Sequence, residues 1–60
     1  MTKKERFYKV YYNLPLNLRE EAIVVINGET ISWKLAKLYI DEEKKTGEEI
    51  LEKLDGYGFI

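Results

Sequence analysis

The sequence predicts an α+β domain in which a small three-stranded antiparallel sheet is followed by two short helices packed on one face (β-β-β-α-α). Three observations carry this prediction. Asn27-Gly28 follows the β-branched run Ile23–Ile26 and suits the centre of a tight hairpin turn, where both φ angles are positive. The segment Arg6–Asn13 alternates as a strand does. Helix-start signals lie downstream, at Ser32 and Thr46.

The length of the chain limits how this fold can be stabilised. Residues 1–60 form one small domain, and a domain of this size buries only about 60% of its extended-chain surface. The chain has no cysteine and no histidine, which excludes disulfides and the thiolate and imidazole ligands of most metal sites. We therefore expect no metal and no cofactor, and we look to packing and self-association for stability.

The first predicted strand has aromatic side chains on both faces. Residues 1–5 precede it as a charged segment that we expect to fray. Two-residue alternation divides the strand into two faces, which carry Phe7, Lys9, Tyr11 and Tyr8, Val10, Tyr12 respectively. One face is thus predicted to join the core, and the other to be covered by something else.

A leucine-rich connection follows the first strand. Pro15 ends the strand, because proline has no N–H for a β-ladder and disfavours helix at Leu14. Three leucines lie between residues 14 and 18, and we expect at least two of them to fold back onto the core. The polar segment Arg19–Glu21 then leads into the second strand.

The second strand and the turn after it are the best-defined part of the sequence. Ala22–Ile26 is apolar at every position, as in a central strand with two covered faces. Two interpretations of the third strand stay open: its alternation continues past Ser32, or Ser32 caps a helix. We favour a strand Glu29–Ile31 and a helix from Trp33 to about Lys45, because serine is a good N-cap and strong helix formers follow. The broad apolar stripe of this helix comprises Trp33, Leu35, Ala36, Leu38, Tyr39 and Ile40.

A second helix is predicted from a capping box. Thr46 and Glu49 stand in the Thr-x-x-Glu pattern, and apolar residues at helical spacing follow them. Asp55-Gly56 is expected to end the helix, because glycine favours the left-handed C-cap position. The apolar tail at residues 57–60 either packs onto the domain or remains free as a peptide ligand.

These elements predict a core and an unpartnered face. The predicted core includes two of the leucines between residues 14 and 18, together with Val10, Ile23, Val25, Ile31, Trp33, Ala36, Ile40, Ile50, Leu51 and Leu54. Ala22, Val24 and Ile26 then point to the other side of the sheet. Since an apolar sheet face needs a cover, the sequence predicts a homodimer formed through it.

Composition argues against several functional classes. Ten basic residues face eleven acidic ones, and the net charge of −1 gives no overall attraction to nucleic acid or anionic membranes. No apolar stretch approaches the roughly 20 residues that span a bilayer, so we expect a cytoplasmic protein. Ser32 is the sole serine and is read as a helix cap, with no histidine to activate it, so we expect no enzyme. Abundant Lys and Glu without Gln is a thermophile-like composition.

Two functional hypotheses remain. The first is a non-enzymatic protein–protein interaction module, a homodimer or a binder of another protein, whose partner surface comprises Phe7, Lys9, Tyr11, Ala22, Val24 and Ile26. The alternative is a nucleic-acid-binding protein, in which aromatic stacking and basic charge hold a single strand through Lys3, Lys4, Arg6, Phe7, Lys9 and Tyr11.

Overall fold

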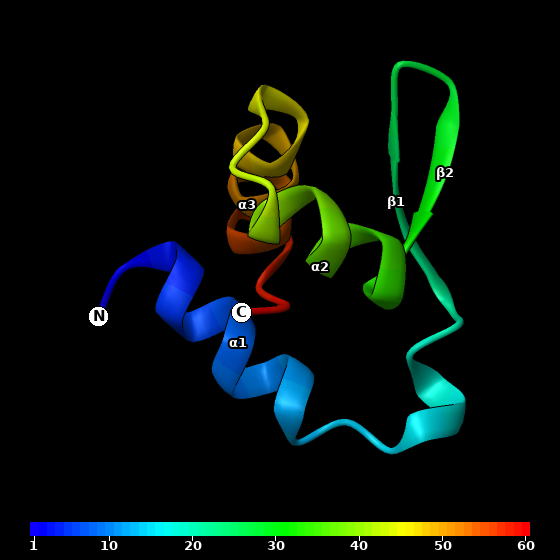
Figure 1. The fold of residues 1–60 in the computed structure, drawn as a ribbon, viewed down its shortest axis with the longest axis vertical. Coiled ribbons are helices and arrows are strands. Elements are labelled where there is room, and N and C mark those ends of the chain that lie inside the picture. Colours follow the sequence, from blue (N-terminus) through cyan, green and yellow to red (C-terminus); the bar gives the residue numbers. More distant parts are fainter.

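The computed structural model describes residues 1–60 and consists of three helices and one β-hairpin. The elements are α1 (Lys3–Tyr12), the single 3-10 turn η1 (Leu16–Leu18), β1 (Ala22–Ile26), β2 (Glu29–Ser32), α2 (Trp33–Asp41) and α3 (Lys45–Tyr57). Figure 1 shows α1 crossing near α2 and α3, with the hairpin standing on the side away from α1. The α+β class is confirmed, but the sheet has two strands where three were predicted, and there are three helices where two were predicted.

The first element is a helix that begins at Lys3, so the predicted strand Arg6–Asn13 is wrong. The Thr2 hydroxyl accepts a hydrogen bond from the N–H of Glu5 (3.1 Å), and the Glu5 carboxylate accepts one from the N–H of Thr2 (2.9 Å). This reciprocal cap satisfies N–H groups that a helix start leaves free. Phe7 and Tyr11 are one helical turn apart, and both are buried. Phe7 and Tyr11 are four residues apart, a spacing that places two side chains on the same face of a strand and also on the same face of a helix. The alternation therefore did not exclude a helix.

The connection after α1 holds one leucine against the core and exposes two. The N–H of Leu14 donates to the carbonyl of Tyr11 (3.1 Å), and its side chain packs against the core. Pro15 is extended, and the single turn of η1 leaves Leu16 76% exposed and Leu18 exposed as well. The expectation that two leucines fold back is therefore wrong, because the turn after Pro15 directs the last two outward.

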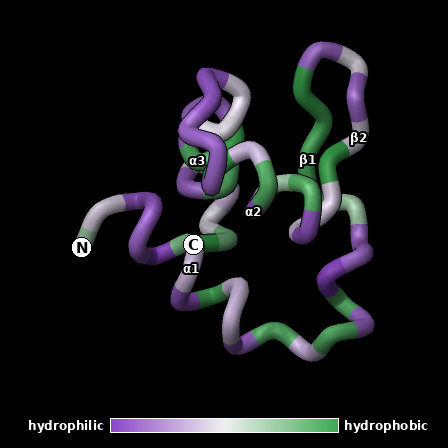
Figure 2. The backbone as a smooth tube through the Cα atoms, in the orientation of Figure 1, coloured by the Kyte–Doolittle hydropathy of each residue, from purple (hydrophilic) through white to green (hydrophobic).

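The hairpin confirms the Asn-Gly turn and reverses the predicted faces. Asn27 and Gly28 have φ angles of 51° and 82°, as a type I′ turn requires, and Ile26 pairs with Glu29. A bulge between Ala22 and Val24 interrupts the ladder before the turn. Figure 2 shows β1 hydrophobic along its length and the turn hydrophilic.

The buried face of β1 carries Val24 and Ile26, and Val25 is 53% exposed. The predicted burial of Val25 is therefore wrong, and so is the outward orientation of Val24 and Ile26. Ile23 is half-buried, and Ala22 is exposed. A run that is apolar at every position does not indicate which face of the strand the helices will cover. The prediction of the buried face therefore had no support in the pattern itself.

Both later helices form, with ends that differ from those predicted. Ser32 caps α2, because its hydroxyl accepts from the N–H of Leu35 (3.1 Å). The helix stops at Asp41 instead of near Lys45, since Glu43 adopts a left-handed φ of 55°. Lys44 is the N-cap of α3, so the predicted capping box at Thr46 does not form.

The end of α3 shows which glycine stops the helix. The helix continues through Gly56, contrary to the predicted end, and Gly58 takes the left-handed C-cap with a φ of 80°. The N–H of Phe59 then donates to the carbonyl of Leu54 (2.9 Å), as in a Schellman motif. Ile60 packs against the core, while Tyr57 and Phe59 remain exposed.

The core lies where the three helices meet one face of the hairpin. Six of its ten buried residues were predicted, namely Ile31, Trp33, Ala36, Ile40, Ile50 and Leu54. The other four are Phe7, Tyr11, Val24 and Ile26. Gly47 permits the close approach of α3 to α2, because a Cβ there would stand 2.8 Å from the carbonyl oxygen of Tyr39. None of the helices combines the length and apolar character needed to cross a membrane.

Candidate functional site

An open groove between α1, the segment after η1 and α2 is the main concave surface of the molecule. We call it the α1–α2 groove, and its volume is about 570 Å³. Its apolar members are Tyr11, Tyr12, Leu35 and Leu38, and its charged members are Arg19, Lys34, Lys37 and Asp41, with Ser32 completing the lining. The groove is large enough to receive several side chains of a partner.

The apolar members divide into a floor and a rim. Tyr11 is 6% exposed and Leu35 is half-buried, so these two side chains form the floor. Tyr12 and Leu38 are 61% and 53% exposed and form the rim. Large apolar side chains that stand around a hollow are typical of interaction sites.

Helix α1 positions the aromatic wall through a stack of rings. The Tyr11 ring stacks on Phe7 with centroids 5.9 Å apart, and Phe7 in turn contacts Trp33 at the start of α2 (5.8 Å). Tyr12 lies edge-on to Tyr11 (5.4 Å) and stacks on Tyr8 (6.0 Å). Because Phe7 is fully buried, this stack fixes the floor of the groove to the core.

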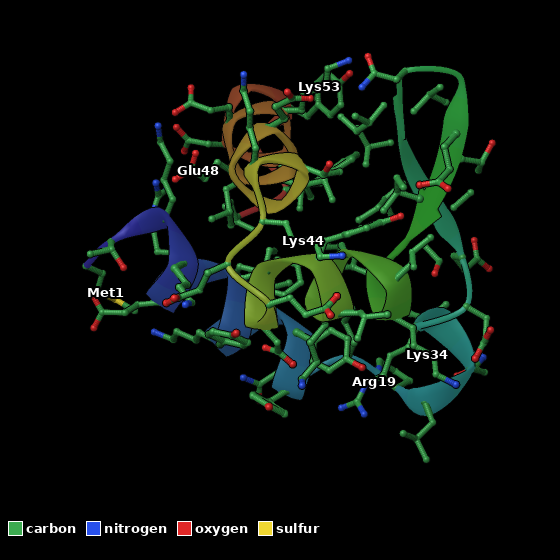
Figure 3. The ribbon with its side chains drawn as sticks, turned by 45° about the horizontal axis from the view of Figure 1, so that its top comes forward. Met1, Arg19, Lys34, Lys44, Glu48 and Lys53 are labelled. Carbon is green, nitrogen blue, oxygen red and sulfur yellow. The ribbon has the colours of Figure 1, made fainter.

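Arg19 lies over the floor without an ionic partner. Its guanidinium carbon is 4.5 Å from the centroid of the Tyr11 ring, within the range of a cation–π contact. Its Nε is shielded from solvent and donates no hydrogen bond. Six basic side chains of the molecule form ion pairs with carboxylates, and Arg19 is not among them. Figure 3 labels Arg19 and Lys34 near the same end of α2.

Lys37 and Asp41 form a neutral pair at the rim of the groove. Lys37 Nζ is 2.6 Å from Asp41 Oδ2 and 5.9 Å from the centroids of both Tyr11 and Tyr12. The Tyr8 hydroxyl also donates to Asp41. The hydrogen bonds from Lys37 and Tyr8 lower the pKa of the Asp41 carboxyl, while burial, followed by the hydrogen bond to Asp41, raises the pKa of Tyr8 to about 12. Asp41 therefore stays ionised and neutralises Lys37.

The predicted partner surface is only partly assembled. Phe7 is fully buried, Tyr11 forms the groove floor, and Lys9 is exposed elsewhere on α1. Val24 and Ile26 are buried beneath the helices and offer nothing to a second copy. The interpretation of Phe7, Lys9 and Tyr11 as one exposed face is wrong, because the segment is a helix.

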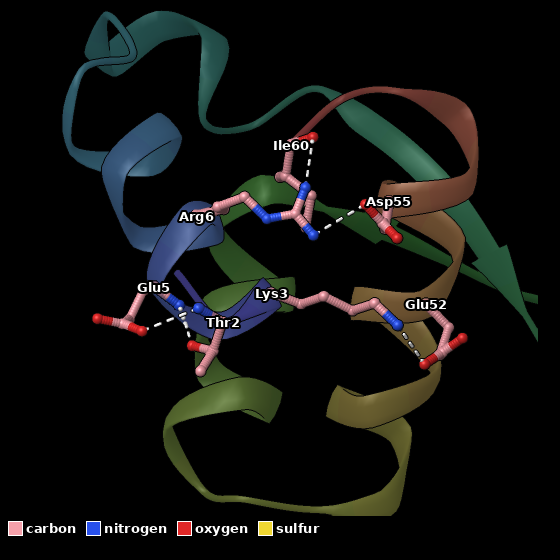
Figure 4. A network of polar contacts seen from close by, with 7 residues as sticks. All are labelled: Thr2, Lys3, Glu5, Arg6, Glu52, Asp55 and Ile60. Atoms are coloured by element: carbon pink, nitrogen blue, oxygen red, sulfur yellow. Dashed lines mark hydrogen bonds and ion pairs between the residues drawn. The ribbon is translucent and has the colours of Figure 1, made fainter.

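Three of the four basic side chains of the nucleic-acid alternative are engaged by carboxylates, and the exposed Lys9 is the exception. Lys3 pairs with Glu52 (2.7 Å), Lys4 with Glu43 (3.3 Å) and Arg6 with Asp55 (2.9 Å). Figure 4 shows two of these pairs crossing from α1 to α3, beside the Thr2–Glu5 cap. They hold the two helices together, so the basic start of the chain is part of the fold.

Of the nine groove residues, sequence reasoning proposed only Tyr11 as a site residue and missed the others, including Tyr12, Arg19 and Leu38. One signal was present: the apolar stripe of α2 is broader than one core contact requires. Trp33, Ala36 and Ile40 fill the core, and Leu38 is left at the surface. A second hollow, of about 410 Å³, lies near the α2–α3 link and is lined mainly by charged residues of both signs.

Comparisons with protein-family models, with curated proteins and with solved structures gave no significant match for this chain. No group of three or more carboxylate side chains gathers in a way that could hold a metal ion.

Proposed function

We propose that this protein is a small non-enzymatic interaction module, which binds another protein through the α1–α2 groove. The observation that carries the proposal is the combination of a hollow of about 570 Å³ with the exposed rim side chains Tyr12 and Leu38. Tyrosine is favoured at interfaces, because its ring buries much area and its hydroxyl stays hydrated. A segment of a partner that covered the rim would remove this apolar surface from water.

A different protein fits the groove better than a second copy does. A two-fold dimer places the same patch on both sides of its interface. Each groove is lined by three basic side chains and one acidic one, so two facing grooves would set a net positive patch against itself, which is unfavourable at an interface. The sheet face that suggested a homodimer no longer argues for one, since Val25 is the one large apolar side chain that it exposes.

Support for a non-enzymatic role comes from the side chains at hand. The groove contains no histidine or cysteine, and the Ser32 hydroxyl on its edge is engaged as the cap of α2. The Asp41 carboxylate is held ionised by Lys37 and Tyr8, so it is poorly suited to accept a proton near neutral pH. What the groove offers is shape, apolar surface and positive charge.

The test is capture of partners by the immobilised protein, compared between two matched variants. Leu38→Glu places a charge on the groove rim, whereas Leu16→Glu makes the same change on η1, outside the groove. We expect a specific partner to be retained by the wild type and by Leu16→Glu, and to be lost by Leu38→Glu. A partner that binds all three proteins equally would contradict the proposal.

Light scattering over a range of concentrations then tests for a second copy as the occupant. We expect a monomer for the wild type and for both variants. A stable dimer that Leu38→Glu converts into a folded monomer would show that the groove binds its own copy, and would contradict a different protein as the partner.

A further inference from the structure

Arg19 has hydrogen-bonding capacity that the protein itself does not use. A guanidinium carries five N–H donors, and at least the Nε–H of Arg19 is both shielded from water and unbonded. A carboxylate supplied from outside cannot reach the shielded Nε–H, but it can pair with the terminal Nη groups, which form no hydrogen bond or ion pair within the protein. The guanidinium of Arg6, in contrast, is paired within the protein, through Nη2 with Asp55 and through Nη1 with the carbonyl of Ile60.

The guanidinium is also held in place before any ligand arrives. It lies 4.5 Å from the Tyr11 ring centroid, and Tyr11 is stacked on the buried Phe7. The main chain at Arg19 is tied to α2, because the Arg19 carbonyl accepts from the N–H of Lys34 (3.0 Å) and the Glu21 carbonyl accepts from the N–H of Trp33 (3.3 Å). A fixed planar donor loses little freedom on binding an anion.

The charge around Arg19 selects an anion. Asp41 neutralises Lys37 at 2.6 Å. Lys34 pairs with Glu20 at 3.6 Å, and both of those side chains are 71% exposed, so that pair is weak. Three of the four charged side chains that line the groove are basic, although the whole chain carries a net charge of −1.

The apolar rim favours a peptide over a nucleic-acid strand as the molecule that carries the anion. Tyr12 and Leu38 need apolar side chains against them, which a peptide supplies from residues next to an acidic one. A nucleic-acid strand would instead present a row of phosphates, and its affinity depends on several unpaired cations. The groove offers mainly Arg19 and the weakly paired Lys34.

We infer that Arg19 is an anion receptor, and that the partner docks a glutamate or aspartate carboxylate on it while neighbouring apolar side chains of the same segment cover Tyr12 and Leu38. This inference rests on the proposed function of the groove. It adds the chemistry of the partner, which is an acidic segment with apolar anchors.

The test is an NMR titration of the isotope-labelled full chain with two peptides that differ only in charge. One is acetyl-Glu-Leu-Glu-Phe-Leu-Glu-amide, and the other has glutamine in place of every glutamate. We expect the acidic peptide to bind at least tenfold more tightly and to shift the Arg19 Nε–H signal together with the amides of Leu35 and Leu38. Arg19→Gln should abolish the preference, and Arg19→Lys should keep part of it, because lysine retains the charge without the planar fork.

The control is Lys45→Gln, which removes one positive charge from an exposed side chain outside the groove. It should leave both affinities unchanged, and thermal unfolding by circular dichroism checks that each variant is folded. If Arg19→Gln does not fold, the comparison of the two peptides on the wild type and on Arg19→Lys still shows whether the preference for the acidic peptide depends on the Arg19 guanidinium.

The failures are distinguishable. Equal binding of both peptides at the groove amides would overturn the carboxylate inference and leave the groove as an apolar docking site. If neither peptide moves those amides at millimolar concentration, the inference fails together with the proposed function. Tighter binding of hexathymidylate at the same amides would overturn the inference in favour of nucleic acid.

Discussion

Arg6 and Arg19 place the same guanidinium at two sites that differ in what faces it. Arg6 lies at the contact of α1 with α3, which we call the α1–α3 seam and which includes the Lys3–Glu52 and Arg6–Asp55 pairs. Its Nη2 is 2.9 Å from Asp55, and its Nη1 donates to the carbonyl of Ile60 (3.4 Å) (Figure 4). Arg19 lies over the Tyr11 ring with no carboxylate beside it. The seam uses its charges to join helix to helix, whereas the groove leaves its charge available. Basic residues that cluster in sequence can therefore be structural, and an isolated one can be the binding residue.

The largest expected difference is between substitutions on the two faces of α1, measured as the loss of unfolding free energy. Phe7 is fully buried against Tyr11 and Trp33, and Tyr12 is 61% exposed at the groove rim. Phe7→Ala leaves a cavity and should cost about 3–5 kcal/mol of unfolding free energy, which is most of the stability of a small domain. Tyr12→Ala should cost less than about 1 kcal/mol, as for an exposed side chain. Denaturant unfolding followed by circular dichroism measures both.

Phe7→Leu provides the intermediate case, because it keeps part of the buried volume and should remain folded. Equal losses for Phe7→Ala and Tyr12→Ala would mean that the groove rim belongs to the core. The distinction between a closed face and an open face of α1 would then be wrong.

Substitution of the two arginines should give a smaller difference in unfolding free energy, with the larger loss at Arg6. Arg6→Gln removes a half-exposed ion pair and a contact to the last residue, so it should lower the unfolding free energy by up to about 1 kcal/mol. Arg19→Gln loses a cation–π contact and removes a shielded unbonded donor, so the net change should lie within about 0.5 kcal/mol. Thermal unfolding at low and high salt measures these changes.

Salt should weaken the effect at Arg6, because screening acts on the ion pair. A larger loss for Arg19→Gln than for Arg6→Gln would show that Arg19 serves the fold, and the groove would lose its available charge.

The sequence determined the hairpin and α2 more firmly than it determined α1. Asn27-Gly28 has few alternatives to a tight turn, and Ser32 acts through a local hydrogen bond, so both predictions are confirmed. In α1 the aromatic residues satisfy strand and helix periods equally, and the Thr2–Glu5 cap decides between them. Thr2 and Glu5 stand in the Thr-x-x-Glu pattern, and the same pattern predicts a cap at Thr46, where none forms.

The groove could not be predicted from the sequence, because it depends on distant contacts. Arg19 belongs to a short polar connector, and only the packing of α1 against α2 brings Tyr11 beneath it. Likewise, Leu38 is apolar and lies on a helix, so its exposure follows from which face of α2 the core covers. Local patterns determine elements, whereas this site arises between elements.

The smallest expected effect is an alkaline titration at the junction of the two regions. Burial, followed by the hydrogen bond to Asp41, raises the pKa of Tyr8 from 10.0 to about 12. The folded state therefore favours the protonated phenol, and this contribution to stability is complete below pH 10 and is lost as the pH rises through 12. Ultraviolet absorbance of tyrosinate should show a late transition that Tyr8→Phe removes.

Asp41→Asn separates the two causes of that shift. It removes the carboxylate charge, so the pKa of Tyr8 should fall toward its ordinary value while burial keeps it raised. Glu29→Gln is the matched control, since Glu29 accepts from the Tyr39 hydroxyl (2.9 Å) and raises the pKa of Tyr39 instead. If Asp41→Asn leaves the late transition unmoved, Asp41 does not hold the Tyr8 hydroxyl in solution. The Lys37–Asp41 pair would then have no hydrogen bond from α1 to hold it at the rim of the groove.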